Sequence, residues 1–236
     1  MSKVNAILLL ISSTILISCS PSEEELMQES RKKMQAENYK EAIDYLNRVI
    51  SKNNDNADAY NMRGVAYLQL LDYSKSVEDF TKAIIIDSSN YKPYYNRGNV
   101  HLQRENYEKA LLDYNKAIDL RPNTADLYIN RASALFELKQ YDAALEDNRF
   151  AIKLSPNNHI PYLNSAKTLL QFGSFNKSDS LLQLSLKINP ESGESYYWAG
   201  FIKINTGNKE GGCDDLIKAK NRGFQDAIEA IEKFCK

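Results

Sequence analysis

Residues able to do chemistry are few in this chain. Two histidines, His101 and His159, and three cysteines, Cys19, Cys213 and Cys235, occur among 236 residues. The cysteines are too far apart for a zinc site of the Cys-x-x-Cys type, and no glycine-rich phosphate loop or nucleophile elbow is present. His101 is expected to be a packing residue, and His159 has no recognisable partner. The sequence therefore predicts no catalytic residues, no metal site and no cofactor.

The charge balance excludes another class of function. Thirty basic residues face 31 acidic ones, which gives a net charge of −1, and 43% of the residues are hydrophobic. A nucleic-acid-binding protein needs a basic face to displace counterions from phosphates, so no nucleic-acid partner is expected. The hydrophobic content is enough for an ordinary core, so long-range disorder is not expected either.

The first residues differ in character from the rest of the chain. Lys3 precedes an apolar run from Ala6 to Ile17, which is shorter than the ~20 residues that a membrane-spanning helix needs and suits a secretory signal peptide. The run ends in Leu16-Ile17-Ser18-Cys19, which resembles the lipobox of bacterial lipoproteins. That resemblance implies that residues 1–18 are removed and that Cys19 is acylated, for example with palmitate. An ordinary signal peptide with an incidental cysteine is the alternative.

Residues 19–22 then form a short linker between the lipid and the folded part. By the same resemblance, Ser20 replaces the aspartate that retains lipoproteins at the inner membrane, which implies an outer-membrane location in the cell envelope. The acidic residues Glu23, Glu24 and Glu25 follow. They fit the first turn of a helix, where the dipole favours negative charge. They also resemble signals that send some lipoproteins to the cell surface, so the membrane face stays open.

A 34-residue period runs through the chain from residue 23 onwards. Large aromatic residues recur at positions 4 and 17 of the period, small residues at positions 8, 20 and 27, and proline at position 32 of three copies. The small residues at position 8 are Ser30, Gly64, Gly98, Ala132, Ala166 and Gly200. The six copies span residues 23–56, 57–90, 91–124, 125–158, 159–192 and 193–224.

This pattern resembles the tetratricopeptide repeat (TPR), in which each copy folds into two antiparallel helices. The resemblance implies an all-α fold, a right-handed superhelical solenoid of six helix pairs. The chemistry of the repeat agrees, because small residues let paired helices approach closely and proline ends a helix. Residues 225–236 carry apolar side chains on one helical face and polar ones on the other, and are predicted to form a capping helix.

Charged residues also follow the period. Arginine occupies position 7 and aspartate position 23 in the same three repeats, and both are absent together from repeats one and five. The sequence therefore predicts structural ion pairs between stacked helices. Asp215 in repeat six has no such arginine. The pairs are Arg63 with Asp79, Arg97 with Asp113, and Arg131 with Asp147.

Cys213 and Cys235 remain as a pair once Cys19 is set aside. They lie at similar distances from a turn near Arg222-Gly223, so antiparallel helices bring them to similar heights. An oxidising compartment then allows a disulfide that holds the capping helix. The alternative is two buried thiols that pack as small apolar groups.

In TPR proteins the first helix of each repeat lines a concave groove, and the resemblance implies the same here. An asparagine amide donates and accepts hydrogen bonds, so a row of asparagines suits the backbone of an extended peptide. These amides alternatively only solvate the groove or bond between helices. The groove residues carried over are Asn61, Gln69, Tyr95, Asn96, Asn99, Gln103, Asn130, Ser133, Asn164 and Lys167.

Aromatic residues gather near the end of this groove. Tyr197 and Phe201 are one helical turn apart in repeat six and would form a binding hot spot if they faced the groove. Packing against the capping helix is the alternative for both.

The sequence thus predicts a non-enzymatic adaptor or scaffold, anchored to a membrane by lipid, that binds an envelope protein or an extended peptide. Two alternatives stay open: an assembly factor for an outer-membrane or secretion complex, and a recruiter of an envelope protease or hydrolase.

Overall fold

Thirteen α-helices and no strand make up residues 20–236, the part of the chain that this computed structural model describes. Cys19 and the predicted signal peptide lie outside the described residues, so the lipid-anchor prediction stays a prediction. The first twelve helices form six pairs: α1 (Glu23–Gln35) with α2 (Tyr39–Lys52), α3 (Ala57–Gln69) with α4 (Tyr73–Ile86), α5 (Tyr91–Gln103) with α6 (Tyr107–Leu120), α7 (Ala125–Glu137) with α8 (Tyr141–Leu154), α9 (Ile160–Leu170) with α10 (Phe175–Ile188), and α11 (Gly193–Asn205) with α12 (Lys209–Asn221). The last helix, α13 (Asp226–Phe234), follows alone.

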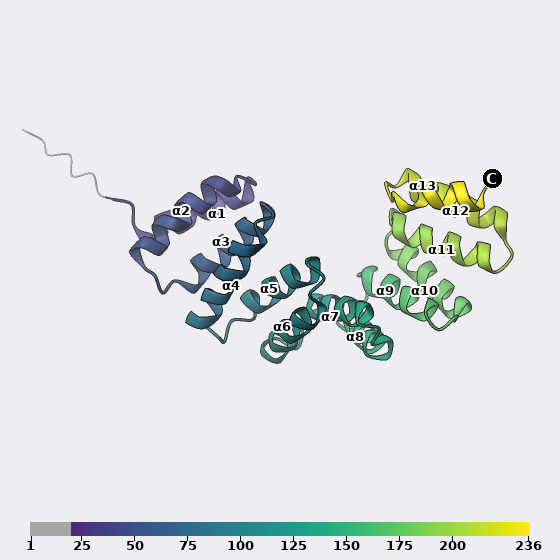
Figure 1. Ribbon diagram of the computed structural model, residues 1–236, viewed down its shortest axis with the longest axis horizontal. Coiled ribbons are helices and arrows are strands. Elements are labelled where there is room, and N and C mark those ends of the chain that lie inside the picture. Colours follow the sequence, from purple (N-terminus) through teal and green to yellow (C-terminus); the bar gives the residue numbers. More distant parts are fainter. Residues whose placement is uncertain (1–19) are drawn as a thin grey trace, which may run out of the picture.

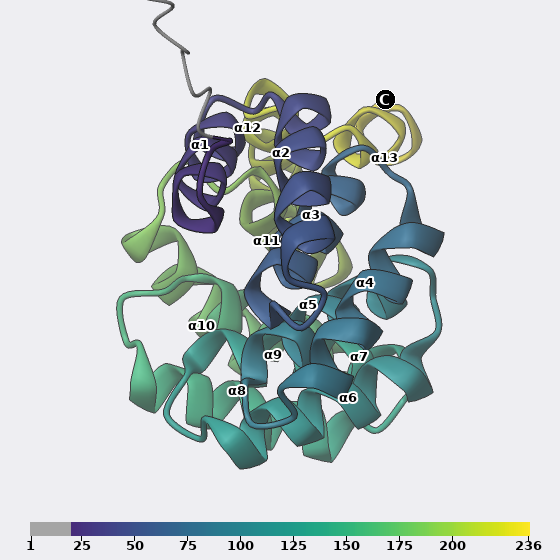
Figure 2. The ribbon, with the colours of Figure 1, turned by 90° about the vertical axis from the view of Figure 1, so that its left-hand side faces the viewer.

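The pairs stack into an open arc (Figure 1). Helices α3, α5, α7 and α9 lie along its inner side, and α4, α6 and α8 lie outside. The two ends of the chain rise on the same side of the arc, with α1 and α2 at one end and α11 to α13 at the other (Figure 2). The prediction of an all-α repeat solenoid is confirmed, and its inner side is built from the first helix of each repeat.

Small residues let the two helices of each pair approach closely, as the repeat pattern predicts. A side chain added at Gly98 would place its Cβ 2.8 Å from the ring of Tyr114, which is fully buried. The close approach also allows a hydrogen bond across the α3–α4 pair, in which the Ser76 hydroxyl donates to the Gly64 carbonyl at 2.8 Å. The small residues at positions 8 and 20 are therefore packing residues of the pair.

The turn inside each pair has a fixed backbone conformation. Position 15 of every repeat has a positive φ: Glu37, Leu71, Glu105, Lys139, Gly173 and Gly207. This left-handed conformation is strained for residues with a side chain and free of that strain for glycine. The last two repeats therefore make the same turn with glycine that the first four make with larger residues.

The predicted arginine–aspartate pairs are confirmed. Arg97 donates to both carboxylate oxygens of Asp113, from Nε at 2.9 Å and from Nη2 at 2.7 Å. The pairs of Arg63 with Asp79 and Arg131 with Asp147 have the same two-pronged geometry. All three aspartates are buried. Hydrogen bonding to the aspartate raises the pKa of Arg63 and of Arg131.

Each of these arginines also joins neighbouring repeats. The aspartate belongs to the second helix of the same repeat, while Nη1 of the arginine reaches the second helix of the preceding one. Arg97 thus donates to Thr81 Oγ1 at 2.9 Å, and the other two reach Asn47 and Asn115. One guanidinium therefore connects three helices from two consecutive repeats.

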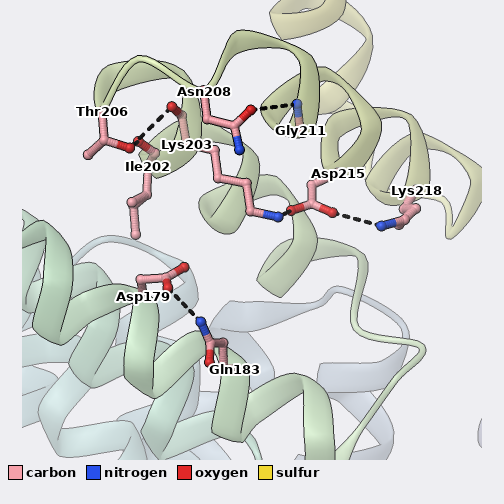
Figure 3. A network of polar contacts seen from close by, with 9 residues as sticks. All are labelled: Asp179, Gln183, Ile202, Lys203, Thr206, Asn208, Gly211, Asp215 and Lys218. Atoms are coloured by element: carbon pink, nitrogen blue, oxygen red, sulfur yellow. Dashed lines mark hydrogen bonds and ion pairs between the residues drawn. The ribbon is translucent and has the colours of Figure 1, made fainter.

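Asp215 in repeat six is neutralised by a different pair of side chains. Lys203 Nζ lies 2.5 Å from Asp215 Oδ2, and Lys218 Nζ lies 2.9 Å from Oδ1. Figure 3 shows both lysines reaching the carboxylate from opposite sides. Lys203 is at position 11, one helical turn after the position that arginine occupies in repeats two to four. Its long side chain therefore reaches the buried aspartate at position 23 of its own repeat.

A disulfide joins Cys213 in α12 to Cys235, directly after α13, with the two Cα atoms 5.7 Å apart. Gly223, with φ +81°, makes the turn between the two helices. Only Ala227 and Ala230 of α13 are buried. Ile231 and Phe234 are partly buried, and the disulfide fixes the end of this short helix to α12.

The acidic run near the start of the folded part begins α1. Glu23, Glu24 and Glu25 form the first turn, and Ser22 and Glu25 make a capping box, in which each side chain bonds the backbone N–H of the other. Glu23 also accepts hydrogen bonds from Asn53 and Asn56, which tie it to the loop between α2 and α3. These contacts give the run a structural role. Within residues 20–236, no helix has both the length and the apolar character to span a membrane.

Candidate functional site

The inner surface of the arc carries the predicted groove residues. Positions 5, 6 and 9 of each repeat lie on one face of its first helix, because they are one helical turn or one residue apart. The inner helices α3, α5, α7 and α9 contact one another in succession. Side chains on this face therefore meet their counterparts from the neighbouring repeats.

Two of the asparagines pair at the N-terminal end of this surface. Asn96 in α5 donates from Nδ2 to Asn61 Oδ1 in α3, at 3.0 Å. Both side chains are partly exposed. Tyr95 and Asn96 also line a shallow hollow with Asp126 and Thr124, between α5 and the start of α7.

A longer polar chain follows between α5, α6 and α7. Asn130 donates from Nδ2 to Asn99 Oδ1 at 2.9 Å and to the Tyr95 hydroxyl at 3.2 Å. The Tyr114 hydroxyl donates to the same Asn99 oxygen at 2.8 Å. Burial raises the pKa of Tyr95 and of Tyr114, so both hydroxyls stay protonated at neutral pH. Some of the amides thus bond between helices, which is the alternative to peptide binding. Their exposed atoms still line the inner surface.

This polar chain stops between repeats four and five. Ser133 turns back to donate to the Ile129 carbonyl of its own helix, at 3.1 Å. The side-chain amide of Asn164 makes no hydrogen bond within residues 20–236. Lys167 instead forms an ion pair with Glu194 at 2.7 Å. Ser133, Asn164 and Lys167 line a cavity of about 50 Å³ between α7, α8 and α9.

The floor of this cavity is Asn148, which sequence reasoning missed. It stands at position 24, where the other repeats carry Leu46, Phe80, Tyr114, Leu182 and Leu216. An asparagine in a row of large apolar and aromatic residues was the available signal. The residue is 1% exposed, and its Oδ1 has no hydrogen-bond partner in the described chain.

The remaining predicted residues lie apart from this cluster. Gln69 and Gln103 are exposed at the last turns of α3 and α5. Tyr197 packs against Phe224, directly before the predicted capping helix, with ring centres 5.0 Å apart, and Phe201 packs against Trp198 at 5.8 Å. Tyr197 therefore packs towards the capping helix, which was the alternative to a binding hot spot. Burial raises its pKa.

Both histidines lie next to side chains that belong to the packing of the helices. His101 is partly buried, with Nε2 4.0 Å from Asp113, and burial lowers its pKa. His159 lies within hydrogen-bond distance of Asn189, directly after α10, at 3.0 Å and of Ser185 in α10 at 3.4 Å. Residues 20–236 bring together no group of three or more metal-ligating side chains.

Comparison with protein families identifies the repeat. The tetratricopeptide repeat family matches residues 57–90, 91–124 and 125–158. Residues 57–158 therefore carry three tetratricopeptide repeats. TPR domains are generally interaction modules for other proteins and not enzymes. No curated protein shows significant sequence similarity to the chain.

Solved structures share the TPR fold at low sequence identity. PilF of Pseudomonas aeruginosa superposes with a TM-score of 0.75 at 17% identity, covering 86% of this chain and 95% of PilF. A TPR protein from Parabacteroides merdae gives 0.70 at 18% identity, over 91% and 84% of the two chains. YrrB, described as a TPR protein with an unusual peptide-binding site, gives 0.62 at 23% identity, over 79% and 97%. At these identities the likeness shows the fold alone.

Proposed function

We propose that this TPR protein is a non-enzymatic adaptor that binds an envelope protein, or an extended segment of one, on the inner surface of its arc. The observation that carries the proposal is the succession of amide side chains along α3, α5, α7 and α9. An amide row can pair with the N–H and C=O groups of an extended peptide without selecting its charge. YrrB, which shares this fold, is described as a TPR protein with an unusual peptide-binding site, and that description supports the proposal.

The lipid anchor belongs to the same proposal. Cys19 carries acyl chains that hold the protein in the outer membrane, facing the periplasm or the cell surface. Several acyl chains on one cysteine bind a membrane far more stably than a single chain does. Because α1 begins at Glu23, the four residues of the linker reach only ~13 Å at ~3.3 Å per residue. The adaptor therefore holds its partner close to the bilayer.

The test is affinity capture of the full-length protein from native envelopes, with mass spectrometry of the bound proteins. A variant with Asn96, Asn130 and Asn164 changed to alanine is captured in parallel, and circular dichroism at the capture temperature verifies that it is folded. We expect the partner recovered with the wild type to fall by about tenfold or more, since several hydrogen bonds are lost.

The matched control changes three amides away from the inner helices: Asn54, Asn176 and Asn221 to alanine. These side chains are exposed and make no hydrogen bond within residues 20–236. The control variant is expected to retain the partner. A partner retained equally by both variants contradicts groove binding and favours the assembly-factor alternative, in which another face docks a folded protein.

A further inference from the structure

The cavity beneath the inner surface, between α7, α8 and α9, has apolar walls from Ala132 and Phe136 and several polar side chains. Asn148 forms its floor, Asn164 and Thr168 its α9 wall, and Ser133 its α7 wall. In repeats two and three the corresponding space is filled by the rings of Phe80 and Tyr114, which are both fully buried. The shorter asparagine in repeat four leaves this space open towards the groove.

Two amides at this cavity lack protein partners. Asn148 is almost fully buried, and its Oδ1 has no partner, which is unfavourable for a buried polar group. Asn164 stands where Asn130 stands one repeat earlier, but Ser133 donates to its own helix and leaves the Asn164 amide unbonded. Whichever way each amide is turned, the cavity wall offers both hydrogen-bond donors and acceptors.

The charges at the rim favour a neutral occupant. Lys167 is already paired with Glu194, and the second charged residue at the rim is the exposed acid Glu137. A carboxylate would meet Glu137 without a free cation. An ammonium group donates only and would leave the amide N–H groups without an acceptor. A carboxamide both donates and accepts, and it carries no charge to desolvate.

The size of the cavity agrees with such a group. Its volume of about 50 Å³ is enough for roughly three to four water molecules, and thus for the three heavy atoms of one carboxamide. We propose that this cavity is a specificity pocket for the carboxamide of a glutamine or asparagine side chain on the bound peptide. The proposal rests on the groove-binding function and names one residue type that the groove selects.

The experiment follows the side-chain NH2 resonances of Asn148 and Asn164 by NMR in the full folded chain. The probes are N-acetyl-glutamine amide, N-acetyl-glutamate amide and N-acetyl-leucine amide, which share a backbone and differ in the side chain. We expect saturable shifts with the glutamine probe and an affinity at least about tenfold weaker for the other two, since each lacks a hydrogen-bonding partner that the pocket needs.

The variant Asn148→Leu makes position 24 identical to Leu182 and Leu216 in the next repeats. It fills the cavity and removes the unbonded amide, so it is expected to fold and to melt no lower than the wild type. It should lose the Asn164 shift caused by the glutamine probe. Equal shifts with the leucine or glutamate probe, an unchanged response in Asn148→Leu, or no saturable shift at all (water as the only occupant) would each overturn the pocket.

These outcomes are separate from those of the capture experiment. If the glutamine probe causes no saturable shift while the three-asparagine variant loses the partner, the pocket proposal is wrong and groove binding stands. If the probe shifts the resonances while that variant retains the partner, groove binding by the amide row is wrong instead.

Discussion

Replacing Arg97 with methionine is expected to lower the free energy of unfolding by about 3–5 kcal/mol, because Asp113 then keeps a buried carboxylate without its partner. Asp113 is 5% exposed and receives two hydrogen bonds from Arg97. Arg97 also donates to Thr81, so one substitution removes the hydrogen bonds that link three helices. For a chain of this size the melting temperature should fall by roughly 6–20 °C.

The matched control is Arg149→Met. Arg149 faces Glu146 at 4.0 Å, but both side chains are more than three-quarters exposed. An exposed pair of this kind contributes between nothing and about 1 kcal/mol, so the control should melt within a few degrees of the wild type. Adding Asp113→Leu to Arg97→Met removes the unpaired charge and should recover part of the loss. An Arg97→Met variant that melts like Arg149→Met would show that the buried pairs do not hold the repeats together.

Removing the link between Cys213 and Cys235 is expected to have the second largest effect. A cross-link that closes about 20 residues stabilises a fold by about 2–4 kcal/mol, mainly by restricting the unfolded chain. Because α13 buries only two alanines, the loss should be local. In the Cys213→Ser, Cys235→Ser variant, the amides of α13 should exchange hydrogen much faster than in the wild type, while those of α7 should not change.

Thiol titration checks the same link directly. The chain carries Cys19→Ser, so only these two cysteines remain, and it is unfolded without reductant. No reactive thiol is expected before reduction and two afterwards. Two reactive thiols before reduction would contradict the disulfide and favour the buried-thiol alternative. Each single serine variant should lose as much stability as the double variant, because either one breaks the same bond.

The sequence predicts the repeated parts of this molecule well, since every repeat tests the same hypothesis again. The arginines at position 7 and the aspartates at position 23 occur together, and the structure pairs them. Their third hydrogen bond, to position 25 of the preceding repeat, was not predicted. That bond depends on how far one helix pair is rotated against the next, which no single repeat encodes.

The parts that depart from the repeat were harder to predict. Asp215 has no arginine at position 7, yet Lys203 reaches it, because residues four apart lie on the same side of a helix. Tyr197 had two candidate directions, and the position of Phe224 after the Gly223 turn decides between them. Asn148 was visible as an exception at position 24, but its open cavity results from the packing of three helices.

The central claim, that the partner binds along the inner helices, is tested most directly by site-specific photo-crosslinking in intact cells. A photoreactive phenylalanine analogue replaces Gln69 or Gln103, or else Lys116 or Lys153. Gln69 and Gln103 are exposed at the ends of α3 and α5, one helical turn beyond position 9 on the inner face, and Lys116 and Lys153 are exposed on α6 and α8. We predict that one partner is crosslinked from both inner positions and from neither outer position. The same partner crosslinked only from Lys116 and Lys153 would contradict the account.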